Sequence, residues 1–215
     1  MFLNLKIAMD RISNVLTKPR NSSRMLYLLV PFLIFFYSLV AIEAWYLGEI
    51  KIVSIRDHWV AMTPVTSLAF LVSSVAMIFH AYNNASYRDH FTGAVNAIVL
   101  MALAAFSFNR SGLNIFPAIE NPLFVEKFIL SSPSLATVFM FVVFSASFFL
   151  KNRIVPSLII CIISLFVLLF GYFLNNPWGT FYFDGHSTGV AFTTAVMFLH
   201  IGLWLYPWKK NHNNG

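Results

Sequence analysis

Of the 215 residues of this chain, 59% are hydrophobic and only 10% are charged, whereas soluble domains carry about 25% charged residues. This composition excludes an ordinary soluble globular protein and predicts an integral membrane protein. The net charge of +6 does not indicate nucleic-acid binding, because the basic residues lie almost entirely between hydrophobic segments, where anchoring at a membrane surface accounts for them. The single cysteine, Cys161, excludes a disulfide framework within these residues and a cysteine metal site.

The first 24 residues predict a helix that lies on the membrane surface. Apolar residues recur there at helical spacings, and basic residues occupy much of the rest. The apolar residues are Phe2, Leu5, Met9, Ile12 and Leu16. Lys6, Asp10 and Arg11 interrupt any apolar stretch of the signal-peptide type. We therefore expect a cytoplasmic amphipathic segment over residues 1–24, a membrane domain over residues 25–208 and a cytoplasmic tail over residues 209–215.

Six segments of the membrane domain are long and apolar enough to form transmembrane helices, which need about 20 residues with a range of roughly 17–25. They are Met25–Leu47, Ala61–Tyr82, Thr92–Phe108, Ser134–Leu150, Ile154–Leu174 and Thr188–Trp208. Helices are expected because backbone groups inside a bilayer must be hydrogen-bonded within the protein. The predicted fold class is therefore an all-α, polytopic membrane bundle of six transmembrane helices.

The distribution of lysine and arginine predicts how this bundle is oriented. Ten of the 14 basic residues fall on the side of the N-terminal segment, and four fall on the other side. The positive-inside rule then places both termini in the cytoplasm of a multi-pass protein, which we expect in a bacterial inner membrane. The longest outer segment, Asn109–Ser132, is either a functional loop or a short helix that covers the bundle.

A similar phrase opens the second, fourth and sixth predicted spans. The three copies are "MTPVTSLAFLVSSVAMIF", "SSPSLATVFMFVVFSASFF" and "GVAFTTAVMFLHIGLWLY". An alignment on Phe70, Phe139 and Phe198 gives separations of 69 and 59 residues. The repetition predicts three helical hairpins, each made of one outgoing and one returning span.

Proline and a hydroxyl residue introduce two of these copies. Pro64 aligns with Pro133, and a proline is tolerated in the first turn of a helix, where its missing N–H has no partner in any case. Thr63 and Ser132 precede the prolines and are the expected N-caps. Small residues further along these helices permit close packing in lipid.

The segments "MTPVTSLAF", "SSPSLATVF" and "VAFTTAVMF", and more loosely "LFGYFLNNPWGTFYFDGHSTG", resemble the MASE-like membrane sensory modules at the N-terminus of bacterial sensor histidine kinases and diguanylate cyclases. The resemblance implies a multi-span domain that senses a stimulus and passes it to a cytoplasmic output domain. After "LWLYPWKK" comes "NHNNG", with no kinase dimerisation helix or catalytic domain. We expect either a shortened sensor or a module that acts through a cytoplasmic signalling partner or a homodimer.

His200 lies well inside the sixth predicted span, where an ionisable residue is a functional-site hypothesis. The alternative is a neutral histidine that is hydrogen-bonded to a neighbouring helix. A haem site would need a second deep histidine, whereas His80 lies at the inner end of the second span, where a polar ring is ordinary. No cofactor is expected.

Two pairs of acidic and histidine residues precede predicted spans on the outer side. Asp57 and His58 precede the second span, and Asp184 and His186 precede the sixth. Such pairs can bind a divalent metal or titrate near neutral pH, and the alternative is that they are solvated loop residues. Because they have no fixed spacing on one helix, no metal site is assigned.

Three further residues are ligand-binding candidates. Trp178 lies in the aromatic loop "NNPWGTFYFDG", which is either a lid over an outward-opening pocket or an interfacial aromatic belt. Glu43, near the outer end of the first span, and Asn96, within the third, are expected to line the interior of the bundle rather than to face lipid.

No hydrolase, metalloprotease, P-loop or dinucleotide fingerprint is present in the chain, so we do not expect an enzyme. The leading hypothesis is a sensory module in which a small or lipophilic stimulus changes the packing of the hairpins and the last span carries the change to the cytoplasm. Alternatives are a transporter or carrier subunit, which predicts a polar path and interrupted helices, and a structural partner in a membrane complex.

Overall fold

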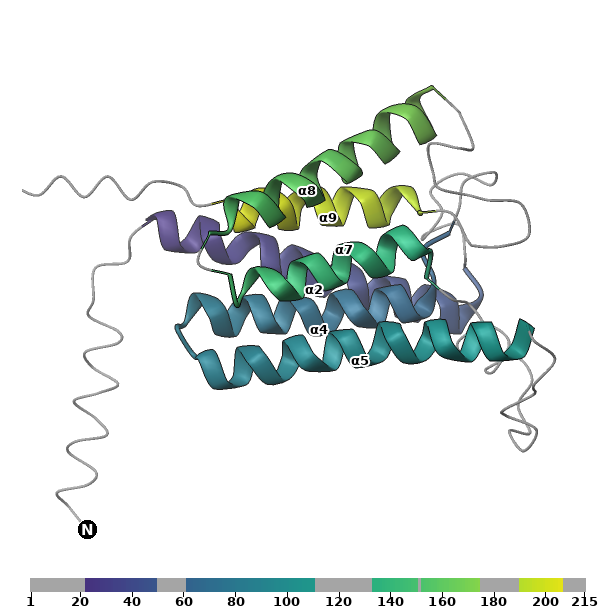
Figure 1. The fold of residues 1–215 in the computed structure, drawn as a ribbon, viewed down its shortest axis with the longest axis horizontal. Coiled ribbons are helices and arrows are strands. Elements are labelled where there is room, and N and C mark those ends of the chain that lie inside the picture. Colours follow the sequence, from purple (N-terminus) through teal and green to yellow (C-terminus); the bar gives the residue numbers. More distant parts are fainter. Residues whose placement is uncertain (1–21, 50–60, 111–132, 151, 175–189, 207–215) are drawn as a thin grey trace, which may run out of the picture.

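The computed structural model describes residues 22–49, 61–110, 133–150, 152–174 and 190–206 (Figure 1). Every regular element within these ranges is a helix, which confirms the all-α fold class. The helices are α2 (Ser22–Leu47), α4 (Pro64–Ala81), α5 (Ala85–Arg110), α7 (Leu135–Ser147), α8 (Ile154–Phe166), its π-helical continuation η2 (Val167–Phe173) and α9 (Phe192–Leu205). The expected amphipathic helix lies almost entirely outside the described residues, and α2 begins at its last few positions.

The helices form an elongated bundle in which direction alternates along the chain (Figure 1). α2, α5 and α8 run one way, and α4, α7 and α9 run the other way. Each helix contacts the next in the chain, and α9 closes the circle by packing on α2. Since about half or more of the residues of α4, α7 and α9 are buried, against about a third of α8, these three are the inner helices of the bundle.

The start of α4 follows from its sequence. Thr63 is the N-cap, and its side-chain oxygen accepts a hydrogen bond from the backbone N–H of Thr66 at 3.3 Å. Pro64 occupies the first helical position, where it removes no intrahelical hydrogen bond. The hydroxyls of Thr63 and Thr66 also lie 2.8 Å apart, so both buried side chains are satisfied locally. The predicted cap of this helix is confirmed.

The start of α7 differs from the prediction. Its N-cap is Ser134, whose hydroxyl accepts from the backbone N–H of Thr137 at 3.2 Å and lies 2.8 Å from the Thr137 hydroxyl. Pro133 therefore stands before the cap instead of inside the first turn, and Ser132 is not the cap. In both proline-led copies the hydroxyl of the N-cap residue lies beside that of the threonine three residues later. The N-cap precedes the proline in α4 and follows it in α7.

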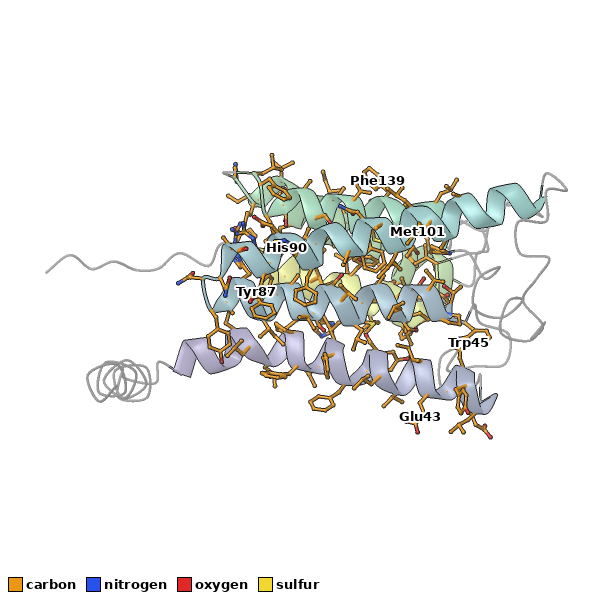
Figure 2. All side chains as sticks on the ribbon, turned by 90° about the horizontal axis from the view of Figure 1, so that it is seen from below. Glu43, Trp45, Tyr87, His90, Met101 and Phe139 are labelled. Atoms are coloured by element: carbon orange, nitrogen blue, oxygen red, sulfur yellow. The ribbon has the colours of Figure 1, made fainter. Side chains whose placement is uncertain are left out.

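A triad of phenylalanine rings fills the centre of the bundle. Phe70, Phe141 and Phe198 are fully buried, and their ring centroids are 4.7–4.9 Å apart in all three pairs. Each ring stands seven residues after the N-cap position of its inner helix. Phe139, on which the middle copy was aligned, is instead 49% exposed and lies on the outer surface (Figure 2). The predicted register of the middle copy was therefore wrong by two residues.

α5 is longer than the predicted span Thr92–Phe108, because the helix already begins at Ala85. Asn83 adopts a left-handed conformation with φ of 57°, which asparagine tolerates better than most residues and which ends α4 abruptly. The side chain of Asn84 then accepts from the backbone N–H of Tyr87 at 3.3 Å, as an N-cap does. Two asparagines in sequence thus form a tight turn, and residues 85–91, which lie between the two predicted spans, belong to α5.

By length and composition, three helices in the described part of the chain can cross a membrane. They are Tyr27–Leu47, Pro64–Ala81 and Ile154–Phe173. α7 and α9 are apolar but shorter, and 13 residues of α-helix extend about 20 Å against a hydrocarbon core of about 30 Å. The described residues thus support a membrane protein with three full-length candidate spans, and the count of six stays a prediction.

The outer surface of the bundle is apolar as well as its core. Phe36 of α2 is 62% exposed, and Ile162 of α8 and Phe173 of η2 are 63% and 82% exposed. Many large apolar side chains exposed on the same bundle are unfavourable in water and are covered by lipid tails in a bilayer. This surface is a second, independent observation in favour of a membrane protein.

The contact between α8 and α9 depends on a glycine. A Cβ atom at Gly202 would lie 2.5 Å from Cys161 Sγ and 3.1 Å from the backbone oxygen of Ser157. The Ser157 hydroxyl donates to the carbonyl oxygen of Gly202 at 2.7 Å across the same contact. At the other end of the pair, Tyr172 in η2 donates to the carbonyl oxygen of Val190 at 2.7 Å. Small residues and interhelical hydrogen bonds are the usual means of helix association in lipid.

Candidate functional site

The ends of six helices meet at one end of the bundle, the end that Tyr87 and His90 mark in Figure 2. These are the N-terminal ends of α2, α5 and α8 and the C-terminal ends of α4, α7 and α9 (Figure 1). Side chains from all six ends interact there in a group that we call the basic end cluster. Its members are Tyr27, His80, Arg88, Phe148, Arg153 and Trp204.

His80, in the last turn of α4, is the centre of this cluster. Arg153 Nη1 donates to His80 Nε2 at 2.6 Å, and Arg88 Nη1 lies 3.5 Å from His80 Nδ1. Because a guanidinium only donates, Nε2 must be the acceptor, and a neutral imidazole then carries its proton on Nδ1. Nδ1 is therefore no acceptor for Arg88, which agrees with the longer distance. The imidazole holds Arg153 by a hydrogen bond and leaves Arg88 unbound to it.

The ring of Phe148 contacts both guanidinium groups. The Arg88 and Arg153 guanidinium carbons lie 5.5 Å and 5.9 Å from the centroid of its ring, within the range of cation–π attraction. The His80 ring packs against the same phenylalanine, with centroids 5.1 Å apart. One buried aromatic ring at the end of α7 thus fixes the two cations on α5 and α8 relative to each other.

Trp204 ties the last helix to the cluster. Its ring lies 5.7 Å from the His80 ring and stacks on Tyr27 at a centroid distance of 4.6 Å. The indole Nε1–H donates to the backbone oxygen of Tyr27 at 2.8 Å. The C-terminal end of α9 is therefore joined to the first turns of the α2 span and to the end of α4.

The basic end cluster has more positive than negative charge among the residues that the structure describes. Arg88 forms an ion pair with Asp89, Nε to Oδ1 at 2.7 Å, and no described carboxylate is paired with Arg153. Burial lowers the pKa of the Arg153 guanidinium, and the positive charge of Arg88 lowers this pKa further, while Tyr27 raises it. Arginine nevertheless stays protonated in proteins, so the excess charge remains in a half-buried place.

The structure separates the three predicted site residues that it describes. Asn96 accepts a hydrogen bond from the buried hydroxyl of Ser145 in α7 at 3.0 Å, so it faces a neighbouring helix as predicted. Glu43 is exposed on the outer side of α2 and does not line the interior, so that prediction was wrong (Figure 2). His200 is also exposed, and its Nδ1 bonds to the Val196 oxygen of its own helix at 2.8 Å instead of to a neighbouring helix.

The other five predicted site residues lie outside the described residues. They are Asp57, His58, Trp178, Asp184 and His186. The metal-binding or titrating pairs and the aromatic lid therefore stay predictions. Among the described residues, no group of three or more histidine, cysteine, aspartate or glutamate side chains is placed to hold a metal ion.

No family model matches this chain, and no curated protein or solved structure matches it either. The similarity to MASE-like sensory modules therefore remains a hypothesis that depends on the three short segments quoted above. Function has to be argued from the contacts of the basic end cluster and from the packing of the inner helices.

Sequence reasoning missed the basic end cluster. His80 was interpreted as an ordinary interfacial ring, and Arg88 and Arg153 were counted only as evidence of orientation. The available signal was positional, because each of these residues lies within a few positions of the same end of a predicted helix. Neighbouring antiparallel helices bring the end of one beside the start of the next, so ionisable residues at several such ends are candidates for contact.

Proposed function

We propose that this protein is a membrane-embedded signal-input module that responds to a small or lipophilic stimulus and passes the change to a cytoplasmic partner through α9. The observation that carries this proposal is the position of Trp204. It stands in the last full turn of α9, close to Tyr206, the last residue that the structure describes, and it contacts both Tyr27 and His80. A displacement of α9 relative to α2 or α4 would therefore alter the last turn before the C-terminal segment.

The proposed arrangement is six spans in three hairpins, α2 with α4, α5 with α7, and α8 with α9, in a bacterial inner membrane with both termini in the cytoplasm. Alternating helix directions and the equal offset of Phe70, Phe141 and Phe198 from their N-cap positions support it. In this arrangement the basic end cluster faces the cytoplasm, as the positive-inside rule requires. The short helices α7 and α9 are among the more buried helices of the bundle, with about half or more of their residues buried, and only part of each faces outward.

The proposed mechanism requires two packed states of similar free energy, between which a stimulus selects. The inner helices are suited to such a change because their hydroxyl side chains bond mainly to their own backbone. Ser73, for example, donates to the Ala69 oxygen at 2.7 Å. Few interhelical hydrogen bonds then have to break when one inner helix shifts against another.

The transporter alternative gains no support from the described core. A transporter predicts a polar path between the inner helices, whereas rings of Phe70, Phe141 and Phe198 occupy the centre. In the described part of the chain, no buried side-chain nitrogen or oxygen is left without a hydrogen bond that a substrate would complete.

The proposal is testable by measuring the distance between the ends of α5 and α9 in lipid nanodiscs. Spin labels at Ala85 and Leu203, both exposed, would report this distance in a Cys161→Ser background. We expect two distance populations whose ratio changes with bilayer thickness, set by short-chain or long-chain phosphatidylcholine, or with added lipophilic extract of the host membrane. A single distance that is constant under all these conditions would reject the proposal.

Trp204→Phe provides the matched variant for this measurement. It keeps the aromatic stack on Tyr27 but removes the hydrogen bond to the Tyr27 oxygen. We expect a broader distribution of the distance between the two labels, because the end of α9 is no longer held to the end of α2. If the protein is only a structural partner, the distribution stays narrow and the same variant has no effect on it.

A further inference from the structure

In a bilayer, the ends of the candidate spans would place the basic end cluster at the boundary between hydrocarbon and headgroups. One candidate span begins at Tyr27, a second ends at Ala81 directly after His80, and a third begins at Ile154 directly after Arg153. The apolar stretches of these three spans therefore stop at the same end of the bundle. In a bilayer, lipid phosphate groups lie just outside the level at which apolar stretches stop. Tyrosine and tryptophan are also enriched at this depth in membrane proteins, and Tyr27 and Trp204 stack there.

Some N–H groups of the two guanidiniums have no acceptor in the part of the chain that the structure describes. A guanidinium has five N–H groups, and the hydrogen bonds described above engage Nε of Arg88 and Nη1 of Arg153, while Nη1 of Arg88 lies 3.5 Å from His80 Nδ1. Among the described residues, neither Nη2 group has an acceptor. The side chain of Arg88 is 15% exposed, and no buried side-chain nitrogen of the described residues lacks a hydrogen bond, so the unpaired donors reach the protein surface, where an anion can approach them. An anion at this place would accept hydrogen bonds from the unpaired N–H groups and would balance the positive charge of Arg88 and Arg153.

We infer that Arg88 and Arg153 bind a phosphate group, supplied by an anionic phospholipid headgroup or by free phosphate. The planar fork of arginine matches phosphate oxygens, and the guanidinium carbons of Arg88 and Arg153 lie 5.5 Å and 5.9 Å from the centroid of one Phe148 ring, which keeps two cationic groups in the same part of the cluster. His80 acts as a positioning residue, since its ring holds Arg153 without competing for the anion.

The start of α8 adds to this site. Arg153 is the N-cap of α8, and its guanidinium, which has no acceptor atom with which to cap the first N–H groups, is held beside this helix end by His80. The partial positive charge at the N-terminus of this 13-residue helix favours an anion at the same place. The inference depends on these contacts alone and holds whether or not the protein carries a signal.

The experiment uses the full-length protein in a neutral detergent and native mass spectrometry with added phosphatidylglycerol or phosphatidylcholine. We expect wild type to retain phosphatidylglycerol preferentially, and Arg88→Gln or Arg153→Gln to bind it roughly tenfold or more weakly, as loss of a charge-assisted hydrogen bond implies. Arg110→Gln is the matched control, because it removes the same charge at the opposite end of α5. Its affinity should equal that of wild type.

Inorganic phosphate separates the two sources of the ligand. If phosphate displaces phosphatidylglycerol and raises the unfolding temperature of wild type but not of Arg88→Gln, the site takes free phosphate. If it does neither while phosphatidylglycerol binds, the site takes the lipid headgroup. Should Arg153→Gln not fold, Arg153→Lys keeps the charge without the fork and is expected to weaken binding less. Equal binding of phosphatidylglycerol and phosphatidylcholine by wild type, or equal phosphatidylglycerol binding by the arginine variants and Arg110→Gln, overturns the inference.

Discussion

Truncation of one ring in the phenylalanine triad tests the packing of the inner helices. Phe141→Ala removes two ring pairs, with Phe70 at 4.9 Å and Phe198 at 4.7 Å, and pairs of this kind contribute roughly 1–3 kcal/mol together. A buried Phe→Ala change in a soluble core costs about 3–5 kcal/mol, part of which is transfer from water that a lipid-solvated unfolded state does not lose. We therefore expect a loss of about 2–3 kcal/mol.

Phe139→Ala is the matched control, because it makes the same change on the same helix two residues away, at a side chain that is 49% exposed. We expect it to change the free energy of unfolding by less than about 0.5 kcal/mol. The assay is reversible unfolding in mixed micelles of mild and denaturing detergent, followed by circular dichroism. If Phe139→Ala proves as costly as Phe141→Ala, the two-residue correction to the register is wrong and the original alignment on Phe139 is right.

Three smaller perturbations can be measured in the same assay. Gly202→Ala should destabilise by about 1–3 kcal/mol, because the new methyl group meets Cys161 and helix backbone, whereas Gly93→Ala, in open space, should be neutral or stabilising. Equal effects of the two would contradict close packing of α8 on α9. Ser134→Ala should cost about 1 kcal/mol through loss of the α7 N-cap, and no loss would mean that the cap lies elsewhere. Asn96→Ala should cost about 0.6 kcal/mol, a usual value for an interhelical hydrogen bond in a membrane, and no measurable loss would mean that Asn96 does not bond to α7.

Composition and apolar runs were sufficient to predict an all-helical membrane protein, because helices are the main solution to backbone hydrogen bonding in lipid. The cap of α4 was predictable for a similar reason, since Thr63 before Pro64 satisfies a local rule. The alignment of the middle copy was wrong because a match of phenylalanine positions alone cannot distinguish Phe139 from Phe141. The N-cap Ser134, which sets the rotation of the helix, decides which of the two rings points inward.

The site residues were predicted less well than the helices. Glu43 and His200 were selected as polar residues in apolar runs, and both turned out to be exposed. In a helix one residue of rotation changes the facing direction by about 100°, so depth in a span does not determine which side a residue faces. His80 and Arg153, 73 residues apart, meet only because the C-terminal end of α4 and the N-terminal end of α8 lie at the same end of the bundle, which depends on how all the helices pack.

Each inner helix contributes to three levels of the bundle. Its N-cap position stands at one end, its triad phenylalanine at the centre, and an aromatic residue of the basic end cluster at the other end, namely His80, Phe148 or Trp204. Because lipid tails are as apolar as the core, these helices are held mainly by close packing and a few hydrogen bonds. A rigid inner helix that tilts or turns at the triad must therefore move its end in the cluster. A stimulus at the far end and an anion at the cluster would then act on the same three helices, which is the physical basis on which the two proposals can be connected.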